Sequence, residues 1–374
     1  MASRLYPTTR LLFLQIVSVL RMLGLTAICS PTQFDLIALY IAGLIILDKR
    51  QTACRITKWL PGRCHDALNR LLRVMPLSTR ALMGLLVAFA RSQGIGGYLS
   101  LDDVVVSKLF ANKLPWAGWA YSSSLSRCIY GMHIVVILWC KGPLHIPVAF
   151  RLWRPEDRCR KGHYRSKLQL AREMVIELQT AGLPFAYLAF DTWYNARWFT
   201  RFLDHCGIIW VSTLKSNSYV VYRHHKQKVQ DLAPTLKLKW RQALDLRAVA
   251  IKVHLPGYGI VRLVVTKDGH GKWGYIVTNA LDVDLTAIVW RKRSRWNIEV
   301  LFRDAKQLNG LAACQCWVDQ AMVRHVAFAL WTYTVLQLLK VNPSETVGDV
   351  KERLQLQVVR AGATPPEPLR ARAA

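Results

Sequence analysis

Hydrophobic residues in the first quarter of the chain repeat at spacings of three and four, which is the period of a helix. This pattern predicts three helices, at 34–47, 64–74 and 79–91. The apolar segment 11–20 is interrupted by Arg21, and we interpret it as a buried N-terminal helix rather than a signal peptide. Two short helical pieces with a Pro-Gly break lie within 55–73, and they fit either a helix-turn-helix or an ordinary helical bundle.

From Gly94 onward the pattern changes to alternating positions, which predict strands. The expected order is three strands, a helix, a strand, a helix and a strand, at 98–106, 132–140, 145–152, 164–180, 185–190, 195–205 and 208–214. Three consecutive strands followed by alternating helices and strands indicate a mixed α/β class. The order is that of a ribonuclease H-like core.

Residues 215–284 return to strand-like sequence, and we interpret them as an inserted β-rich subdomain. A helix is then expected from about Leu285 to Leu308 and an amphipathic helix from about Gln320 to Lys340. The tail from Arg360 is predicted to be disordered. The domain prediction is therefore a helical, DNA-binding region at 1–92, a core in two parts at 93–214 and 285–342, the insertion at 215–284, and a C-terminal segment at 343–374.

The charge of the chain indicates a polyanionic partner. Its 374 residues include 51 Lys and Arg against 23 Asp and Glu, a net charge of +28. Lys and Arg bind nucleic-acid phosphates favourably because binding releases counterions, so nucleic acid is the first candidate. An anionic membrane surface fits less well, because the surplus is spread along the chain instead of forming one terminal block.

Neither a membrane span nor a metal motif of cysteines is expected. The longest stretch without Asp, Glu, Lys or Arg, from His325 to Leu339, is shorter than the roughly 18 to 20 residues of a span. The nine cysteines contain no CxxC pair, which favours free thiols in a reducing compartment. Cys54, Cys64 and His65 lack a matching second pair of zinc ligands, and so do Cys314 and Cys316.

Acidic residues at the ends of apolar runs are candidates for chemistry, because a buried carboxylate needs a cationic partner. Asp102 and Asp103 end the apolar run that starts at Tyr98, and Asp191 ends the run that includes Phe190. A lone Asp at such a place is more often a turn or a helix cap. Two of them on strands that are adjacent in the expected topology favour a shared site.

A third carboxylate, Glu299, lies in a basic helical segment. On a continuous helix Lys292, Arg295, Glu299, Arg303 and Lys306 fall within an arc of about 80°, opposite an apolar face. A solvated helix with ordinary Glu–Arg pairs explains this stripe by itself. Together with Asp102 and Asp191, however, Glu299 completes a set of carboxylates that suits two Mg²⁺ ions in a phosphoryl transfer.

These motifs resemble those of the DDE transposases of the IS4 superfamily, in particular the IS701-like group. That family has a Tyr, Arg, Glu and Lys signature, which Arg295, Glu299 and Lys306 match, with Lys292 at the place of the tyrosine. The segment from Phe190 to Tyr194 resembles the second-Asp motif, and the segment from Leu101 to Lys108 resembles the first. The resemblance covers residues 30–340, and Asp103 remains an alternative to Asp102 because Val104 replaces the expected threonine.

The resemblance implies a function and a set of roles. Asp102, Asp191 and Glu299 would be the catalytic residues and the ligands of two Mg²⁺ ions, with Mn²⁺ as an alternative, while Lys292, Arg295, Arg303 and Lys306 would bind DNA phosphates. The reaction would be metal-dependent cleavage of insertion-sequence ends and strand transfer into target DNA. Trp273 is a candidate to stack on a flipped base, although core packing is the more common role of a tryptophan.

The expected partners are double-stranded DNA, as terminal inverted repeats and target, and a second copy of the chain in a homodimer that holds two element ends. No membrane partner is expected, and the expected location is the bacterial cytoplasm, at the nucleoid. Two alternative functions remain: a catalytically inactive, transposase-derived DNA-binding protein, and a ribonuclease H-like nuclease that only hydrolyses DNA.

Overall fold

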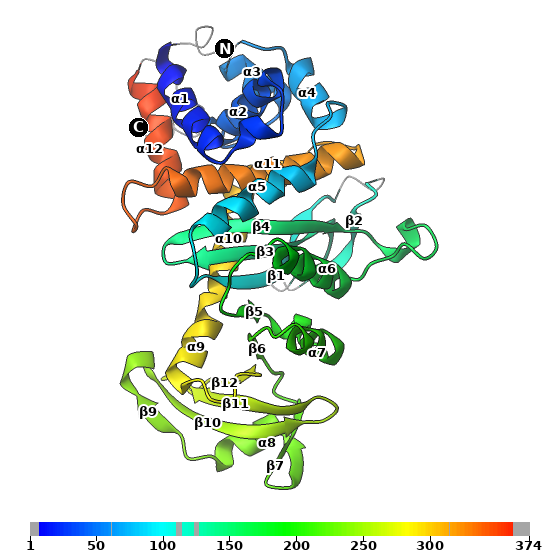
Figure 1. Ribbon diagram of the computed structural model, residues 1–374, viewed down its shortest axis with the longest axis vertical. Coiled ribbons are helices and arrows are strands. Elements are labelled where there is room, and N and C mark those ends of the chain that lie inside the picture. Colours follow the sequence, from blue (N-terminus) through cyan, green and yellow to red (C-terminus); the bar gives the residue numbers. More distant parts are fainter. Residues whose placement is uncertain (1–6, 61, 110–113, 123–126, 314, 362–374) are drawn as a thin grey trace.

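The structure is a computed structural model that describes residues 7–60, 62–109, 114–122, 127–313 and 315–361. The molecule is elongated, with helices at one end, a sheet through its length and a second group of strands at the other end (Figure 1). The predicted mixed α/β class is confirmed. The disordered tail predicted from Arg360 lies, after Ala361, outside the described residues.

The N-terminal end is helical, as its apolar periodicity predicts. Its helices are α1 (Pro7–Met22), α2 (Pro31–Ile46), α3 (Ala53–Trp59), α4 (His65–Arg73) and α5 (Thr79–Ser92). The central helix α2 is buried on nearly every side, and its start is capped by Ser30 and Gln33, which bond each other's backbone N–H groups. The break between α3 and α4 fits the expected Pro-Gly break, and whether this pair is a helix-turn-helix remains a hypothesis.

Five strands form the part of the sheet that carries the acids. They are β1 (Tyr98–Ser107), β3 (Arg127–Lys141), β4 (Leu144–Trp153), β5 (Leu188–Phe190) and β6 (Trp210–Thr213), and β2 (Ala117–Ser122), which the sequence pattern did not predict, pairs with the start of β3. Strands β4, β3 and β1 are antiparallel, and β5 and β6 continue the sheet parallel to β1. The observed order β4-β3-β1-β5-β6 follows the order predicted from the sequence.

The strands of residues 219–278 continue the same sheet. They are β7 (Tyr219–Tyr222), β8 (His225–Lys228), β9 (Lys239–Arg241), β10 (Leu246–Leu255), β11 (Gly259–Lys267) and β12 (Trp273–Thr278), with the short helix α8 (Val229–Leu232). Strand β12 pairs antiparallel with β6, so the segment predicted as an insertion is joined edge to edge to the central strands. The division of the chain into domains stays a prediction.

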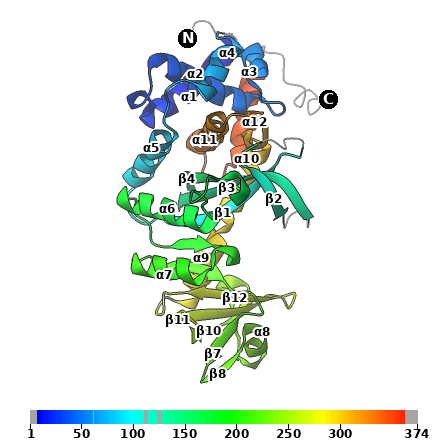
Figure 2. The ribbon, with the colours of Figure 1, turned by 90° about the vertical axis from the view of Figure 1, so that its right-hand side faces the viewer.

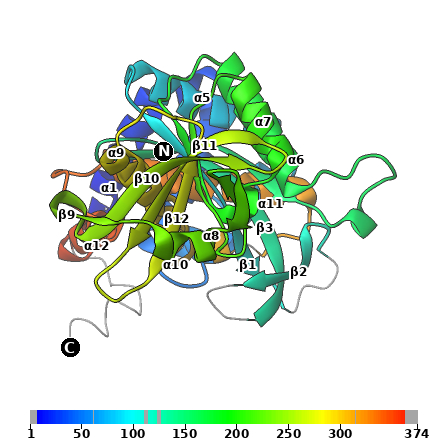
Figure 3. The ribbon, with the colours of Figure 1, turned by 90° about the horizontal axis from the view of Figure 1, so that it is seen from below.

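Helices cover both faces of the central strands. Helices α6 (Lys167–Thr180) and α7 (Arg197–His205) lie on one face, and α9 (Leu285–Ser294) and α10 (Trp296–Gln307) lie on the other (Figure 2). Viewed from the other end of the molecule, β10, β11 and β12 lie side by side with α9 beside them (Figure 3). Side chains on opposite faces of β1 therefore point toward different helices.

The single helix expected from Leu285 to Leu308 is wrong. Two helices occupy this segment, and they meet at Arg295, which ends α9 and precedes α10. The angular positions derived for one continuous helix therefore hold within α10 but do not carry over to Lys292 on α9.

The last two helices, α11 (Asp319–Leu338) and α12 (Val347–Arg360), pack against the N-terminal helices. The prediction that α11 is amphipathic is wrong, because nearly all of its residues are buried, including Arg324 and His325. Through its two terminal guanidinium nitrogens, Arg324 donates to the carbonyl groups of Leu71 and Leu77. Helix α12 was not predicted. No helix in the described part of the chain is long and apolar enough to span a bilayer.

Candidate active site

The strand register places Asp102 and Asp191 side by side. In the parallel pair of β1 and β5, Leu101 is opposite Phe190, so the next residues along the two strands are the two aspartates. Strand β5 ends there, whereas β1 continues through Asp102 to Ser107. The carboxylate of Asp191 accepts from the N–H of Thr192 at 2.5 Å and begins a short 3-10 helix. The cap role expected for a lone Asp is therefore real for Asp191, and it holds this residue beside Asp102.

The two adjacent aspartates of β1 face opposite sides of the sheet, as strand alternation requires. Asp102 accepts from the guanidinium of Arg295 at 2.7 Å, on the side covered by α10. Asp103 pairs with Lys167 at the start of α6, at 2.5 Å, on the other side. Only Asp102 therefore shares a face with Glu299.

Arg295 joins the first and third candidate acids. One guanidinium nitrogen contacts Asp102, and the other contacts the carboxylate of Glu299, one helical turn further along α10. The side chains of Arg295 and Asp102 are only 16% and 18% exposed, and that of Glu299 is 33% exposed. The geometry thus brings together predicted residues of one strand and one helix around a single, partly buried guanidinium.

The electrostatics of this cluster show that negative charge is concentrated there. Burial raises the pKa of Asp102 to about 7, even though the nearby Arg295 guanidinium acts to lower it. Burial alone would also lower the pKa of Arg295. Three carboxylates, those of Asp102, Glu299 and Asp191, outweigh that effect and raise the pKa of the guanidinium. All three predicted acids therefore act on the same group.

Two tyrosines hold the break between α9 and α10, and the sequence prediction missed both. Tyr98 and Tyr187 stack face to face with ring centroids 5.0 Å apart. The Tyr98 hydroxyl accepts from Asn297 of α10 at 2.6 Å, and the Tyr187 hydroxyl bonds that of Ser294 of α9 at 2.9 Å. Each tyrosine precedes its aspartate by four residues, and this repeated Tyr-x-x-x-Asp spacing is a signal that the sequence does contain.

Behind the acids, Tyr194 connects the second-Asp segment to β1. It is buried and donates to Asp103 at 3.1 Å. Asp103 therefore has a structural role that its position beside Asp102 did not reveal: it binds the turn that follows Asp191. Its second partner, Lys167, also lies near the ring of Trp193, at 5.5 Å from the centroid.

The remaining predicted DNA-binding residues surround the acids less closely. Burial is the main cause that lowers the pKa of both Lys292 and Lys306, and the cations of Arg295 and Arg293 add to it at Lys292. Arg303 is exposed on α10 and its guanidinium contacts Asp304 at 3.1 Å. Trp273 lies in β12 under the ammonium of Lys267, at 4.8 Å, and it is partly buried.

The donor set suits a divalent cation in kind, because Mg²⁺ and Mn²⁺ prefer carboxylate oxygens. The raised pKa of Asp102 shows that its buried negative charge is unfavourable, and a bound cation would reduce that cost. In the described residues, however, no three His, Cys, Asp or Glu side chains are close enough together to hold a metal ion. The guanidinium of Arg295 lies between Asp102 and Glu299 at this place.

Comparison with known proteins identifies the class. A family model described as DDE superfamily endonuclease matches residues 25–238, more than half of the chain. The chain belongs to this family, and it is an enzyme that acts on DNA. A second model, described as the archaeal putative transposase ISC1217, matches residues 147–342. The chain is thus a DDE transposase, which confirms the resemblance seen in its motifs.

Solved structures agree with this fold. The chain is similar to the piggyBac transposase in its synaptic complex with hairpin DNA, with a TM-score of 0.50 and 12% identity over 99% of this chain and 86% of that chain. At this identity the likeness concerns the fold alone. No curated protein matches the sequence.

Proposed function

We propose that this transposase cleaves the ends of an insertion sequence and joins them to target DNA, by a cut-and-paste route. The observation that supports the proposal most directly is the convergence of Asp102, Asp191 and Glu299 on Arg295 in a chain of the DDE family. The strand order β4-β3-β1-β5-β6 supports a ribonuclease H-like core around these acids. We propose Asp102, not Asp103, as the first acid because it shares a face with Glu299.

The three acids would hold the divalent cations that such chemistry uses, two Mg²⁺ or Mn²⁺ ions, which supply an activated oxygen and neutralise charge on the phosphate. Arg295 has a second task in this scheme. Its two nitrogens form a planar fork that suits a phosphate as well as a carboxylate. We propose that Arg295 bridges Asp102 and Glu299 in the free protein and binds a phosphate of the element end when the acids bind cations.

Positive side chains around the acids would hold the DNA backbone. Lys292, Lys306 and Arg303 come from the two helices on the acid side of the sheet, and they retain this proposed role. Exposed tryptophans also lie on these helices, with Trp296 next to Arg295 at 61% exposure. A homodimer would hold the two element ends together, and the helices of residues 1–92 would contact the repeats.

Incubation of the purified protein with labelled element ends, Mg²⁺ and a target plasmid tests the proposal. We expect cut ends and joined products from the wild type, and a loss of both of at least about 10³-fold in Glu299→Gln. Glu352→Gln on α12, an exposed acid far along the chain, is the matched control and should leave both unchanged.

The two alternative functions predict different results in the same assay. Cutting without joining would identify a hydrolytic nuclease, and binding without cutting would identify an inactive DNA-binding relative. Unchanged cutting by Glu299→Gln would show that the site assignment is wrong.

A further inference from the structure

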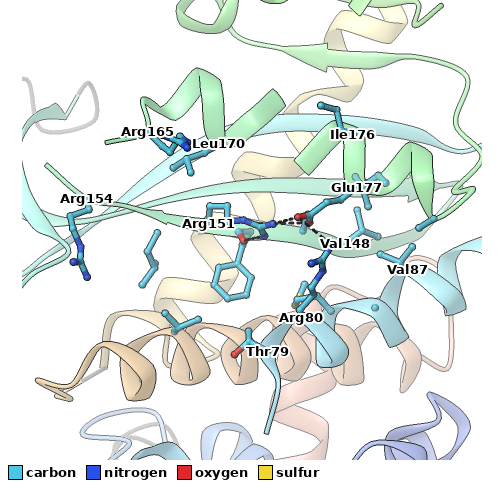
Figure 4. Close-up of a pocket in the computed structure, with 18 of the residues that line it drawn as sticks. Thr79, Arg80, Val87, Val148, Arg151, Arg154, Arg165, Leu170, Ile176 and Glu177 are labelled. Atoms are coloured by element: carbon cyan, nitrogen blue, oxygen red, sulfur yellow. Dashed lines mark hydrogen bonds and ion pairs between the residues drawn. The ribbon is translucent and has the colours of Figure 1, made fainter. Parts of the chain in front are cut away.

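A large hollow lies on a different part of the molecule from the acids. It has a volume of about 1150 Å³ and is bordered by α5, β4, α6 and the loop between β4 and α6. Five consecutive residues of β4, from Val148 to Leu152, line it, so that it follows the free edge of this strand. Figure 4 shows β4 between α6 and α5, with labelled side chains from all three elements around the hollow. We call it the β4 groove.

The cations of the β4 groove are all arginines among its described residues. They are Arg80, Arg151, Arg154, Arg160 and Arg165, and the groove contains one acid, Glu177. Its floor is apolar, with Val148, Phe150 and Leu170 among the residues that form it. Arginine is the side chain that best matches phosphate, because its planar fork donates two parallel hydrogen bonds.

The ion pairs inside the β4 groove leave a positive surplus. Arg151 donates to both carboxylate oxygens of Glu177, at 2.7 and 2.6 Å, and Arg80 reaches the same carboxylate at 3.9 Å. Asp319 and Glu173 each pair with one further arginine of the groove. Five arginines less these three acids leave a charge of 5 − 3 = +2 after every such pair is counted.

One wall of the groove is connected to the strand that carries Asp102, on the face opposite Asp102 itself. Arg165 at its rim precedes Lys167 by two residues, and Lys167 binds Asp103 on the back of the acid-bearing strand. Helix α6 lines the groove from there to Glu177 and Thr180. A strand of DNA that leaves the acids around the edge of the sheet would therefore meet arginines along this path.

We propose that the β4 groove binds the phosphodiester backbone of one DNA strand, outside the reacting phosphate. Arg80 and Arg160 are the contacts that a phosphate reaches first, because both are exposed and the Arg80 side chain is 84% exposed. Glu177 limits the affinity, since it competes with phosphate for Arg80 and Arg151. The inference rests on the DNA substrate of the family and does not require strand transfer.

Salt-dependent binding of labelled DNA, measured by anisotropy in EDTA on single-stranded and duplex oligonucleotides, tests the proposal. The Arg80→Ala, Arg160→Ala double variant should bind about tenfold more weakly at physiological salt. The slope of log K against log salt should fall by about 0.7 to 0.9 for each lost phosphate contact. Arg360→Ala on α12, another exposed arginine, measures the general effect of one lost charge, and twice its change in log K is the control for the double variant.

The acid of the groove provides the opposite test. Glu177→Gln should bind the same DNA more tightly than wild type. Glu352→Gln removes the same charge outside the groove, so its gain in affinity measures the general charge effect and should be smaller. A thermal melt of each variant shows that the fold is retained. An effect confined to one oligonucleotide form identifies whether a free strand or one strand of a duplex occupies the groove.

The proposal is overturned if the change in log K of the double variant is no more than twice that of Arg360→Ala on both DNA forms. It is also overturned if Glu177→Gln does not bind more tightly than Glu352→Gln. These outcomes are independent of the proposed chemistry. Binding in EDTA does not involve cleavage, so a wild type that fails to cut DNA would leave the test of the β4 groove intact.

Discussion

At the scale of single residues, the active site depends on which way neighbouring side chains point. Asp102 and Asp103 are adjacent in sequence and chemically identical, yet one contacts Arg295 and the other contacts Lys167 and Tyr194. The first arrangement offers a carboxylate to the predicted catalytic cluster. The second binds the turn after Asp191 to the sheet.

This difference predicts different losses for two matched substitutions. Asp102→Asn should abolish DNA cleavage, with a fall of at least about 10³-fold, because it removes an acid of the proposed site. Asp103→Asn should retain measurable cleavage but lower the free energy of unfolding by about 1 to 3 kcal/mol, because it weakens buried bonds to Lys167 and Tyr194. Cleavage rates and urea unfolding of both variants are the measurements. Equal loss of cleavage with equal stability would contradict the assignment of Asp102 as the first acid.

At the scale of elements, the break between α9 and α10 positions Glu299. Helix α10 starts immediately after Arg295, and Tyr98 and Tyr187 contact the two sides of that junction. Burial raises the pKa of both tyrosines, so both hydroxyls stay neutral and keep their hydrogen bonds at ordinary pH. The start of β1 thus holds the helix that carries the third acid.

The tyrosine pair leads to a prediction about rate. Tyr98→Phe keeps the stacked ring but removes the bond from Asn297 and the 3.4 Å bond to the Ser294 carbonyl, so α10 should lose its fixed position relative to Asp102. We expect a cleavage rate about fivefold lower, with DNA affinity changed by less than about twofold, since one hydrogen bond is worth about 1 kcal/mol. Tyr187→Phe is the control, because its hydroxyl contacts Ser294 of α9 and not α10. A loss of affinity equal to the loss of rate would argue against a positioning role.

At the scale of the whole molecule, helices from both ends of the chain support the end of α10. Lys351 of α12 is only 2% exposed and donates to the carbonyl groups of Leu308 and Leu47, at 2.6 and 3.3 Å. It also pairs with Asp48 at 3.0 Å. One buried ammonium therefore connects α12, the end of α2 and the residue that follows α10.

Loss of this ammonium should destabilise the whole fold. Lys351→Met fills a similar volume but removes the cation that meets Asp48 and two carbonyl groups, which keep the neutral amide donors of Gln355 and Gln51, at a cost of about 2 to 4 kcal/mol. Lys49→Met, an exposed lysine in the same region, should change stability by no more than about 0.5 kcal/mol. Urea unfolding followed by circular dichroism measures both. Similar midpoints for the two variants would contradict this role of Lys351.

The sequence by itself indicated the class of the fold, the adjacency of the two strands that end in Asp102 and Asp191, and the three candidate acids, because these depend on local periodicity and on residue chemistry. Strand Tyr98–Ser107 was predicted to within one residue, and Asp191 was found because it ends a short apolar run. Charge likewise needs no structure, and the net +28 already indicated a polyanionic partner.

Only the tertiary structure decided how these parts meet. The different contacts of Asp102 and Asp103, the break at Arg295 and the burial of most of α11 all depend on contacts between residues far apart in the chain. The β4 groove is of the same kind, since its arginines come from a helix, a strand and a loop that are separate in sequence. Periodicity reports the faces of one element, but packing determines which element each face meets.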